Sequence, residues 1–129
     1  MRGSRPNAMR RFTRLGRPLG LRRAGKEGSG TSIVQHVGRK SGRAYETPVV
    51  ATRHDDDFLI ALPYGQRTDW LQNVLAKGEA GIVMNGHEYR ADHPEVVPMR
   101  DATVYFRKKQ QRLHRRFGLE SALKLHMVS

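Results

Sequence analysis

Residues 38–43 read Gly-Arg-Lys-Ser-Gly-Arg and hold the groups in this chain that are best suited to bind an anion. Two glycines frame three basic side chains and a hydroxyl, and glycine supplies the positive φ that a tight turn needs. Backbone N–H groups in such a turn, together with Arg39, Lys40 and Arg43, can form a phosphate cradle. The same residues could equally be a solvated hairpin tip. We call this segment the basic turn.

Other chemistries find little support in the residue pattern. No Gly-x-x-x-x-Gly-Lys-Ser/Thr motif precedes a helix, and no Gly-x-Gly-x-x-Gly motif indicates a dinucleotide site. The chain has no cysteine, which excludes disulfides, thiolate metal sites and a cysteine nucleophile. The six histidines are scattered without the spacing of metal ligands, so we expect no metal site. Glu46 and Glu88 do not form the carboxylate-pair pattern that glycoside chemistry uses.

The length and the charge distribution narrow the class of protein. A chain of 129 residues is one ordinary domain, and it has no apolar run of about 18 residues that could span a membrane. The net charge of +12 lies at the two ends. Residues 1–43 carry twelve Lys/Arg and one acidic residue. Residues 44–106 carry five Lys/Arg and ten acidic residues, and residues 107–129 carry seven Lys/Arg and one acidic residue. Such ends attract nucleic acid, anionic lipid or a phosphorylated small molecule, and composition does not choose among them.

The basic turn is predicted to join short antiparallel strands. β-Branched residues and a continuous apolar run favour strands at residues 31–37, 45–52 and 58–62. Pro48 cannot donate to a ladder, so the second strand should lie at a sheet edge or bulge there. The links between strands are too short for the crossovers that parallel strands require. The sheet should therefore be antiparallel.

One helix and one hairpin are predicted in the middle of the chain. Thr68 is a good N-cap for the helix, and Gly78 is typical of the position after its end. The expected apolar stripe consists of Trp70, Leu71, Val74 and Leu75. Asn85-Gly86 predicts a tight hairpin within residues 81–91, because both turn residues must adopt positive φ.

The two ends are predicted to be partly helical. Residues 1–30 form a basic, partly flexible N-terminal segment in which residues 9–23 have a short helical pattern. Residues 101–125 suggest one or two amphipathic helices interrupted at Gly118. Residues 31–129 are then a mainly β domain with flanking helices (α+β), in which five or six strands curl into a small barrel beside a C-terminal helix.

The basic turn is followed by three further informative segments: Thr47-Pro-Val-Val50, Pro63-Tyr-Gly65 and Asp69-Trp-Leu-Gln-Asn-Val-Leu75. In this order the run resembles the deazaflavin-dependent nitroreductase family, flavin/deazaflavin oxidoreductases of split β-barrel fold. That family has a Gly-Arg-Lys-Ser-Gly-type turn, an Arg/Thr-Pro strand and a helix with Trp-x-x-Asn-Leu. The last motif reads Trp70-Leu-Gln-Asn-Val74 here. The resemblance covers about residues 31–97.

The resemblance implies coenzyme F-420, a deazaflavin with a phosphate and an anionic oligoglutamate tail, with FMN as the alternative. The residues that would hold the phosphate are Arg39, Lys40, Ser41, Gly42 and Arg43. The segment along the ring system would be Thr47, Pro48, Val49 and Val50. The next strand end would approach the deazaflavin through Pro63, Tyr64 and Gly65. The helix would close the site with Thr68, Asp69, Trp70 and Asn73.

The resemblance also implies the reaction, a hydride transfer from the reduced deazaflavin to a nitroaromatic, quinone or activated enone. Such an enzyme needs few catalytic side chains, because the coenzyme carries the difficult step. Some family members have tyrosines near the C-terminus that are associated with substrate protonation. Here that region offers Tyr105, and Tyr64 is the weak candidate nearer the ring. We assign no proton donor from the sequence.

Other functions remain as alternatives. A small basic barrel can bind nucleic acid, but the acidic middle of the chain and an aromatic content of 7% argue against it. Residues 9–23 and 101–125 could attach the protein to an anionic membrane surface. A split barrel could also bind FMN or another ligand without turnover. We expect a cytoplasmic protein, with attachment to the inner face of the membrane and a homodimer left open.

Overall fold

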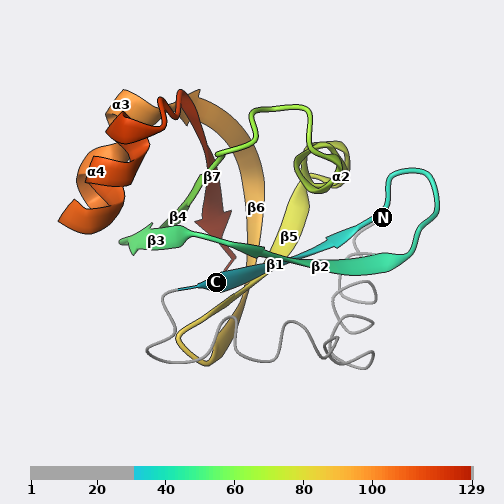
Figure 1. The fold of residues 1–129 in the computed structure, drawn as a ribbon. Coiled ribbons are helices and arrows are strands. Elements are labelled where there is room, and N and C mark those ends of the chain that lie inside the picture. Colours follow the sequence, from blue (N-terminus) through green and yellow to red (C-terminus); the bar gives the residue numbers. More distant parts are fainter. Residues whose placement is uncertain (1–30, 129) are drawn as a thin grey trace.

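A computed structural model describes residues 31–128, in which seven strands form one curled antiparallel sheet (Figure 1). The strands are β1 (Ser32–Val37), β2 (Ala44–Val49), β3 (Ala51–His54), β4 (Asp57–Ala61), β5 (Glu79–Met84), β6 (His87–Pro98) and β7 (Ser121–Met127). Their spatial order is β2-β1-β5-β6-β7-β4-β3. The helices are α2 (Asp69–Lys77), α3 (Met99–Ala102), the 3-10 helix η2 (Thr103–Tyr105) and α4 (Lys108–Arg116). The predictions for residues 1–30 lie outside the described residues.

The predicted strand at residues 45–52 is divided at Val50 into the two edges of the sheet. β2 is one edge and β3 is the other, although a single residue separates them in the chain. The Ala61 N–H donates to the Val50 carbonyl over 3.0 Å, which fixes this crossing. Pro48 lies exposed on β2. Its expected edge position is confirmed.

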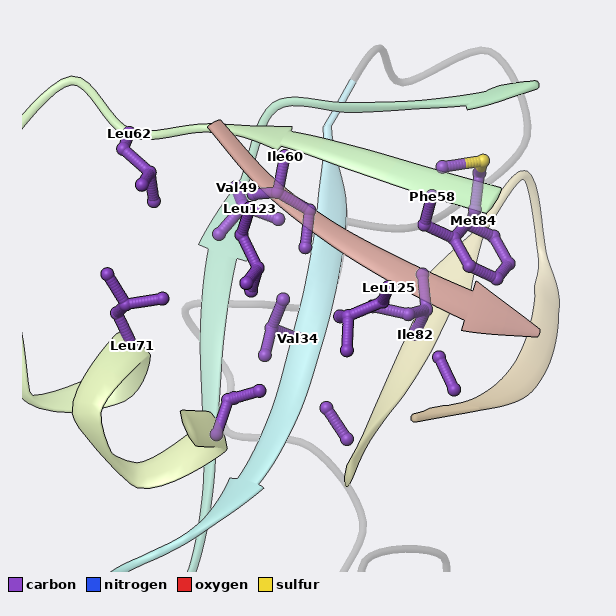
Figure 2. Close-up of a cluster of buried hydrophobic side chains, with 13 residues drawn as sticks. Val34, Val49, Phe58, Ile60, Leu62, Leu71, Ile82, Met84, Leu123 and Leu125 are labelled. Atoms are coloured by element: carbon purple, nitrogen blue, oxygen red, sulfur yellow. The ribbon is translucent and has the colours of Figure 1, made fainter. Parts of the chain in front are cut away.

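Apolar side chains pack on both faces of the curled sheet. The inner cluster includes Leu71 and Val74 of α2, and Figure 2 shows Leu71 pointing toward the strands. The outer cluster lies under α3 and η2 and includes Met99 and Phe106. β4 contributes to both: Phe58 and Ile60 belong to the inner cluster, while Leu59 and Ala61 belong to the outer one. Its continuous apolar run therefore follows from burial on both faces.

The predicted helix is confirmed as α2, with two differences at its surface. It ends as expected at Gly78, whose φ is 80° and whose N–H donates to the Val74 carbonyl over 2.8 Å. Thr68 occupies the N-cap position, but its hydroxyl makes no capping bond, and Thr68 Oγ1 is buried without a partner among the described residues. Leu75 is 37% exposed, so the predicted apolar stripe is too wide. The helix covers the sheet with a narrower face.

The predicted hairpin is confirmed between β5 and β6. Asn85 has a φ of 52° and Gly86 a φ of 81°, the left-handed pair that this turn requires. β6 continues to Pro98, and its register with β7 shifts between Asp92 and Glu95. The one extra residue of this bulge allows the long strand to bend with the sheet.

The helices predicted within residues 101–125 are confirmed before Gly118, but the prediction that helix continues beyond it to residue 125 is wrong. The helical region stops at α4, Gly118 has a φ of 63°, and residues 121–127 form β7 in the middle of the sheet. Leu123 and Leu125 are fully buried, whereas Lys124 and His126 between and beyond them face outward or are half-exposed. This period of two is the signal of a strand. It also raises the strand count above the five or six expected.

Leu123→Ala should lower the free energy of unfolding by about 2–5 kcal/mol, because Leu123 is 0% exposed and its truncation leaves a cavity between β6 and β4. The matched control is Glu95→Ala, at the exposed position that pairs with Lys124. This substitution should change the free energy of unfolding by less than about 0.5 kcal/mol. Urea unfolding measures both. Equal effects would contradict a central position for β7.

Candidate functional site

A cleft of about 530 Å³ opens where the basic turn meets the start of α2. β1 leads into the turn, β2 leaves it, and α2 packs against β1, so three separate segments meet here. The lining residues are His36, Gly38, Arg39, Lys40, Ser41, Tyr45, Asp69 and Asn73. The structure therefore brings five of the sequence-predicted site residues together: Arg39, Lys40, Ser41, Asp69 and Asn73.

Backbone hydrogen bonds close the basic turn. The Gly38 N–H donates to the Arg43 carbonyl over 2.8 Å, and the Gly42 N–H donates to the Gly38 carbonyl over 2.9 Å. Gly42 has a φ of 72°, as expected for the second glycine of the turn. At Gly38 a Cβ would come within 2.5 Å of Ser41 Oγ and 3.0 Å of the Tyr45 ring. Both glycines are therefore required for local geometric reasons.

The buried side chain of Asn73 joins α2 to the basic turn. Asn73 Oδ1 accepts from the Arg39 backbone N–H at 3.1 Å and from Arg39 Nη1 at 2.7 Å. Because the amide oxygen is occupied by these donors, the amide nitrogen faces the other way. Asn73 Nδ2 then donates to His36 Nδ1 over 3.1 Å.

His36 is held as a neutral imidazole of one tautomer. Its Nδ1 accepts from Asn73, so the proton lies on Nε2, which donates to Thr47 Oγ1 over 2.9 Å. Burial lowers the pKa of His36 from 6.5 to about 4, because the charged ring would lose its hydration. His36 is thus a hydrogen-bonding link between β1, β2 and α2. Neither ring nitrogen is free for another partner near neutral pH.

The three cations of the basic turn have different surroundings. Arg39 is turned inward, since its guanidinium contacts Asn73 and its Nη2 lies 3.1 Å from Asp69 Oδ1. Lys40 and Arg43 are exposed, and neither has an ion-pair partner within residues 31–128. An anion at the turn would therefore meet Lys40 and Arg43 first.

The remaining predicted residues lie around this cleft or away from it. Thr47 is the hydrogen-bond partner of His36, and Trp70 packs against the inner core. Val49 is buried in that core, whereas Val50 lines a second cleft of about 260 Å³ beside Arg53 and Arg107. Residues 63–65 form an exposed loop in which the Tyr64 side chain is 85% exposed, and none of the three lines the first cleft.

Two lining residues, His36 and Tyr45, were missed by sequence reasoning. They pair directly across β1 and β2, and their rings stack with centroids 5.7 Å apart. The available signal was positional, because His36 precedes the basic turn by two residues and Tyr45 follows it by two. Within the described part of the chain, no group of three His, Cys, Asp or Glu residues could hold a metal ion.

His36 predicts a specific pH dependence of stability. Its folded-state pKa lies below the unfolded value, so its contribution is present above about pH 6.5 and is lost as the pH falls toward 4. Between pH 7 and pH 5 the loss should be about 2 kcal/mol. His36→Gln, which can still accept from Asn73 and donate to Thr47, should remove this part of the pH dependence. Urea unfolding of both proteins at the two pH values provides the measurement, and parallel pH profiles would contradict a buried neutral imidazole.

The sequence and the fold of this chain were compared with those of known proteins, and the sequence matches one family. The model of the family described as "F420H(2)-dependent quinone reductase" matches residues 8–116. A solved structure called "F420-H2 Dependent Reductase (FDR-A)" aligns with a TM-score of 0.58 at 9% identity, covering 75% of this chain and 94% of that one. Another, called "F420 Reductase", gives 0.52 at 11% identity, covering 88% and 97%. No match is found among curated proteins.

A third solved structure, described as a domain-swapped dimer, aligns with a TM-score of 0.56 at 9% identity, covering 75% of this chain and 80% of that one. At these identities the structural neighbours show the fold, and they confirm the expected split-barrel architecture with a mainly β sheet and flanking helices. The family match confirms the expected relationship to deazaflavin-dependent oxidoreductases and the dependence on coenzyme F-420. Because the match spans most of its length, the chain belongs to the F420H(2)-dependent quinone reductase family.

Proposed function

We propose that the protein binds reduced coenzyme F-420 in the cleft beside the basic turn and reduces a quinone. The observation that carries the proposal is the position of Lys40 and Arg43, which have no ion-pair partner among residues 31–128, on a turn at the end of a cleft of about 530 Å³. When bound, the coenzyme supplies a hydride. The family match supports a quinone over the nitroaromatic and enone alternatives.

The residues of the turn fit the anionic part of this coenzyme. A phosphate and an oligoglutamate tail need cations and N–H donors, and Lys40 and Arg43 offer charge that no carboxylate in the described part of the chain neutralises. The cleft volume lies within the range of about 300–1,000 Å³ that is typical of small-molecule sites. FMN has a phosphate but no oligoglutamate tail, so it would neutralise less of the positive charge of Lys40 and Arg43.

In this proposal the protein's own residues hold and orient the coenzyme and do not themselves react. Asn73 and Asp69 fix Arg39, which sets the conformation of the turn, while His36 ties the turn's supporting strands together. Tyr45, 42% exposed beside His36, offers an aromatic wall to a flat ring. This division of roles leaves binding of the anionic tail to Lys40 and Arg43.

Reduction of a quinone needs a proton as well as a hydride. His36 is not a suitable source, since its Nε2–H is engaged by Thr47 and its Nδ1 accepts from Asn73. We infer that water provides the proton at the open mouth of the cleft. A homodimer is a further expectation in keeping with the domain-swapped neighbour, and light scattering of the purified protein would test it.

Lys40→Ala and Arg43→Ala should each weaken binding of coenzyme F-420 by about 1.5–3 kcal/mol, roughly 10- to 150-fold in Kd, through loss of a charged hydrogen bond. Their unfolding free energies should stay within about 0.5 kcal/mol of the parent, because both side chains are exposed and form no ion pair with another described residue. Trp70 is the single tryptophan, and its fluorescence follows the titration.

Arg90→Ala is the matched control, since Arg90 is exposed on β6, away from the cleft, and forms no ion pair among the described residues. It should leave the Kd unchanged. A parallel titration with FMN tests the choice of coenzyme. Tighter binding of FMN than of coenzyme F-420 would contradict the proposed coenzyme. Unaltered F-420 binding in a folded Lys40→Ala/Arg43→Ala variant would contradict the proposed site.

Tyr64→Phe should keep kcat within about twofold of the parent, because the Tyr64 side chain is 85% exposed and does not line the cleft. Steady-state oxidation of reduced coenzyme F-420 with a soluble quinone measures this rate. A fall of tenfold or more, with unchanged coenzyme affinity, would instead assign Tyr64 the proton-donor role that water has here.

A further inference from the structure

The segment from Arg107 to Phe117 combines concentrated positive charge with exposed apolar side chains. It contains six Lys/Arg and no Asp or Glu. Leu113 is 41% exposed and Phe117 is 68% exposed, although both are large apolar residues. Neither contributes to the inner or the outer core cluster. The coenzyme proposal makes no use of this region.

Helical geometry places the apolar and basic side chains of α4 next to one another. Leu113 and Phe117 are four residues apart and therefore share a side of the helix. Lys109 precedes Leu113 by one turn, and the Arg116 guanidinium lies 5.8 Å from the centre of the Phe117 ring. We call Lys109, Arg112, Leu113, Arg116 and Phe117 the α4 surface.

The side of α4 opposite the α4 surface is packed against neighbouring residues. His114 is 5% exposed, its Nδ1 lies 2.8 Å from Thr103 Oγ1, and its ring meets Phe106 edge-on at 4.8 Å. The adjoining 3-10 helix is tied to β3, since Thr52 Oγ1 donates to the Tyr105 carbonyl over 3.0 Å. The exposed side chains thus project from a helix whose other side is tied to η2, which is itself hydrogen-bonded to β3.

We propose that the α4 surface docks the protein on an anionic phospholipid bilayer. Lys109, Arg112 and Arg116 complement lipid phosphates, while Leu113 and Phe117 enter the boundary between headgroups and acyl chains. Nucleic acid would satisfy the cations but would leave the apolar pair in water. No helix among the described residues is long and apolar enough to cross a bilayer. Figure 1 shows α4 and α2 at opposite sides of the molecule, which keeps the cleft beside α2 away from this contact.

Co-sedimentation of the full chain with vesicles tests the proposal. One set contains phosphatidylcholine with about one-third phosphatidylglycerol and the other contains phosphatidylcholine alone. We expect binding to the anionic set only. Leu113→Gln/Phe117→Gln and Lys109→Gln/Arg112→Gln/Arg116→Gln should each lower the partition coefficient at least tenfold. Circular dichroism melts establish that both variants fold.

The matched control removes the same number of charges elsewhere. Arg67→Gln/Lys77→Gln/Arg90→Gln changes three exposed residues outside the α4 surface and should alter partitioning less than twofold. An equal loss in this control, no binding of the parent, or loss with the charge variant but not the apolar one would overturn the proposal. The last pattern, together with duplex DNA binding that is lost in the same charge variant, would indicate nucleic acid.

Phe117→Trp supplies an independent readout. Its emission, taken as the difference from the parent protein with Trp70 alone, should shift to shorter wavelength on addition of the anionic vesicles, because the ring leaves water. An unshifted spectrum under conditions where the protein sediments with vesicles would show that another part of the chain makes the contact. That result would also overturn the proposal.

Discussion

The crossing at Val50 constrains the whole sheet. Neighbouring strands lie about 4.8 Å apart, so seven strands laid flat would separate the edges by about 29 Å. The last residue of β2 and the first of β3 are separated only by Val50, a link of at most about 7.6 Å between Cα atoms. The sheet must therefore curl until its edges meet at this end. The curl encloses the inner core, and it leaves the other end of β1 and β2, with the basic turn, open beside α2.

At that open end a single buried amide connects elements that are distant in sequence. Asn73 satisfies two donors from Arg39 and supplies one to His36, so its oxygen and nitrogen are not interchangeable. The arrangement works only with a neutral His36, because a second ring proton would face the Asn73 NH₂ group without an acceptor. Burial lowers the pKa of His36, and the neutral ring that results is the form that this contact with Asn73 needs.

The sequence predicts best what short segments determine by themselves. Asn85-Gly86 specifies its hairpin, Gly78 the end of α2, and Pro48 an edge strand, because each acts through local backbone geometry. β7 was missed because its alternating leucines follow a basic helical stretch and were absorbed into that pattern. The contact between His36 and Asn73 spans 37 residues and leaves no signal in the local sequence. The basic turn could therefore be recognised from its composition, but the hydrogen bonds from Asn73 that hold it could not be predicted.

The position of β7 also bears on how the chain acquires its fold during synthesis. β7 joins β6 to β4, and without it the sheet consists of a β2-β1-β5-β6 part and a separate β4-β3 hairpin. On the ribosome these two parts emerge before residues 121–127, joined through Val50 and through residues 62–78 but without strand pairing between them. The edges of β6 and β4 then remain exposed to pairing with other nascent chains. A translational pause or a premature stop just before Ser121 would therefore favour aggregation over a smaller folded product.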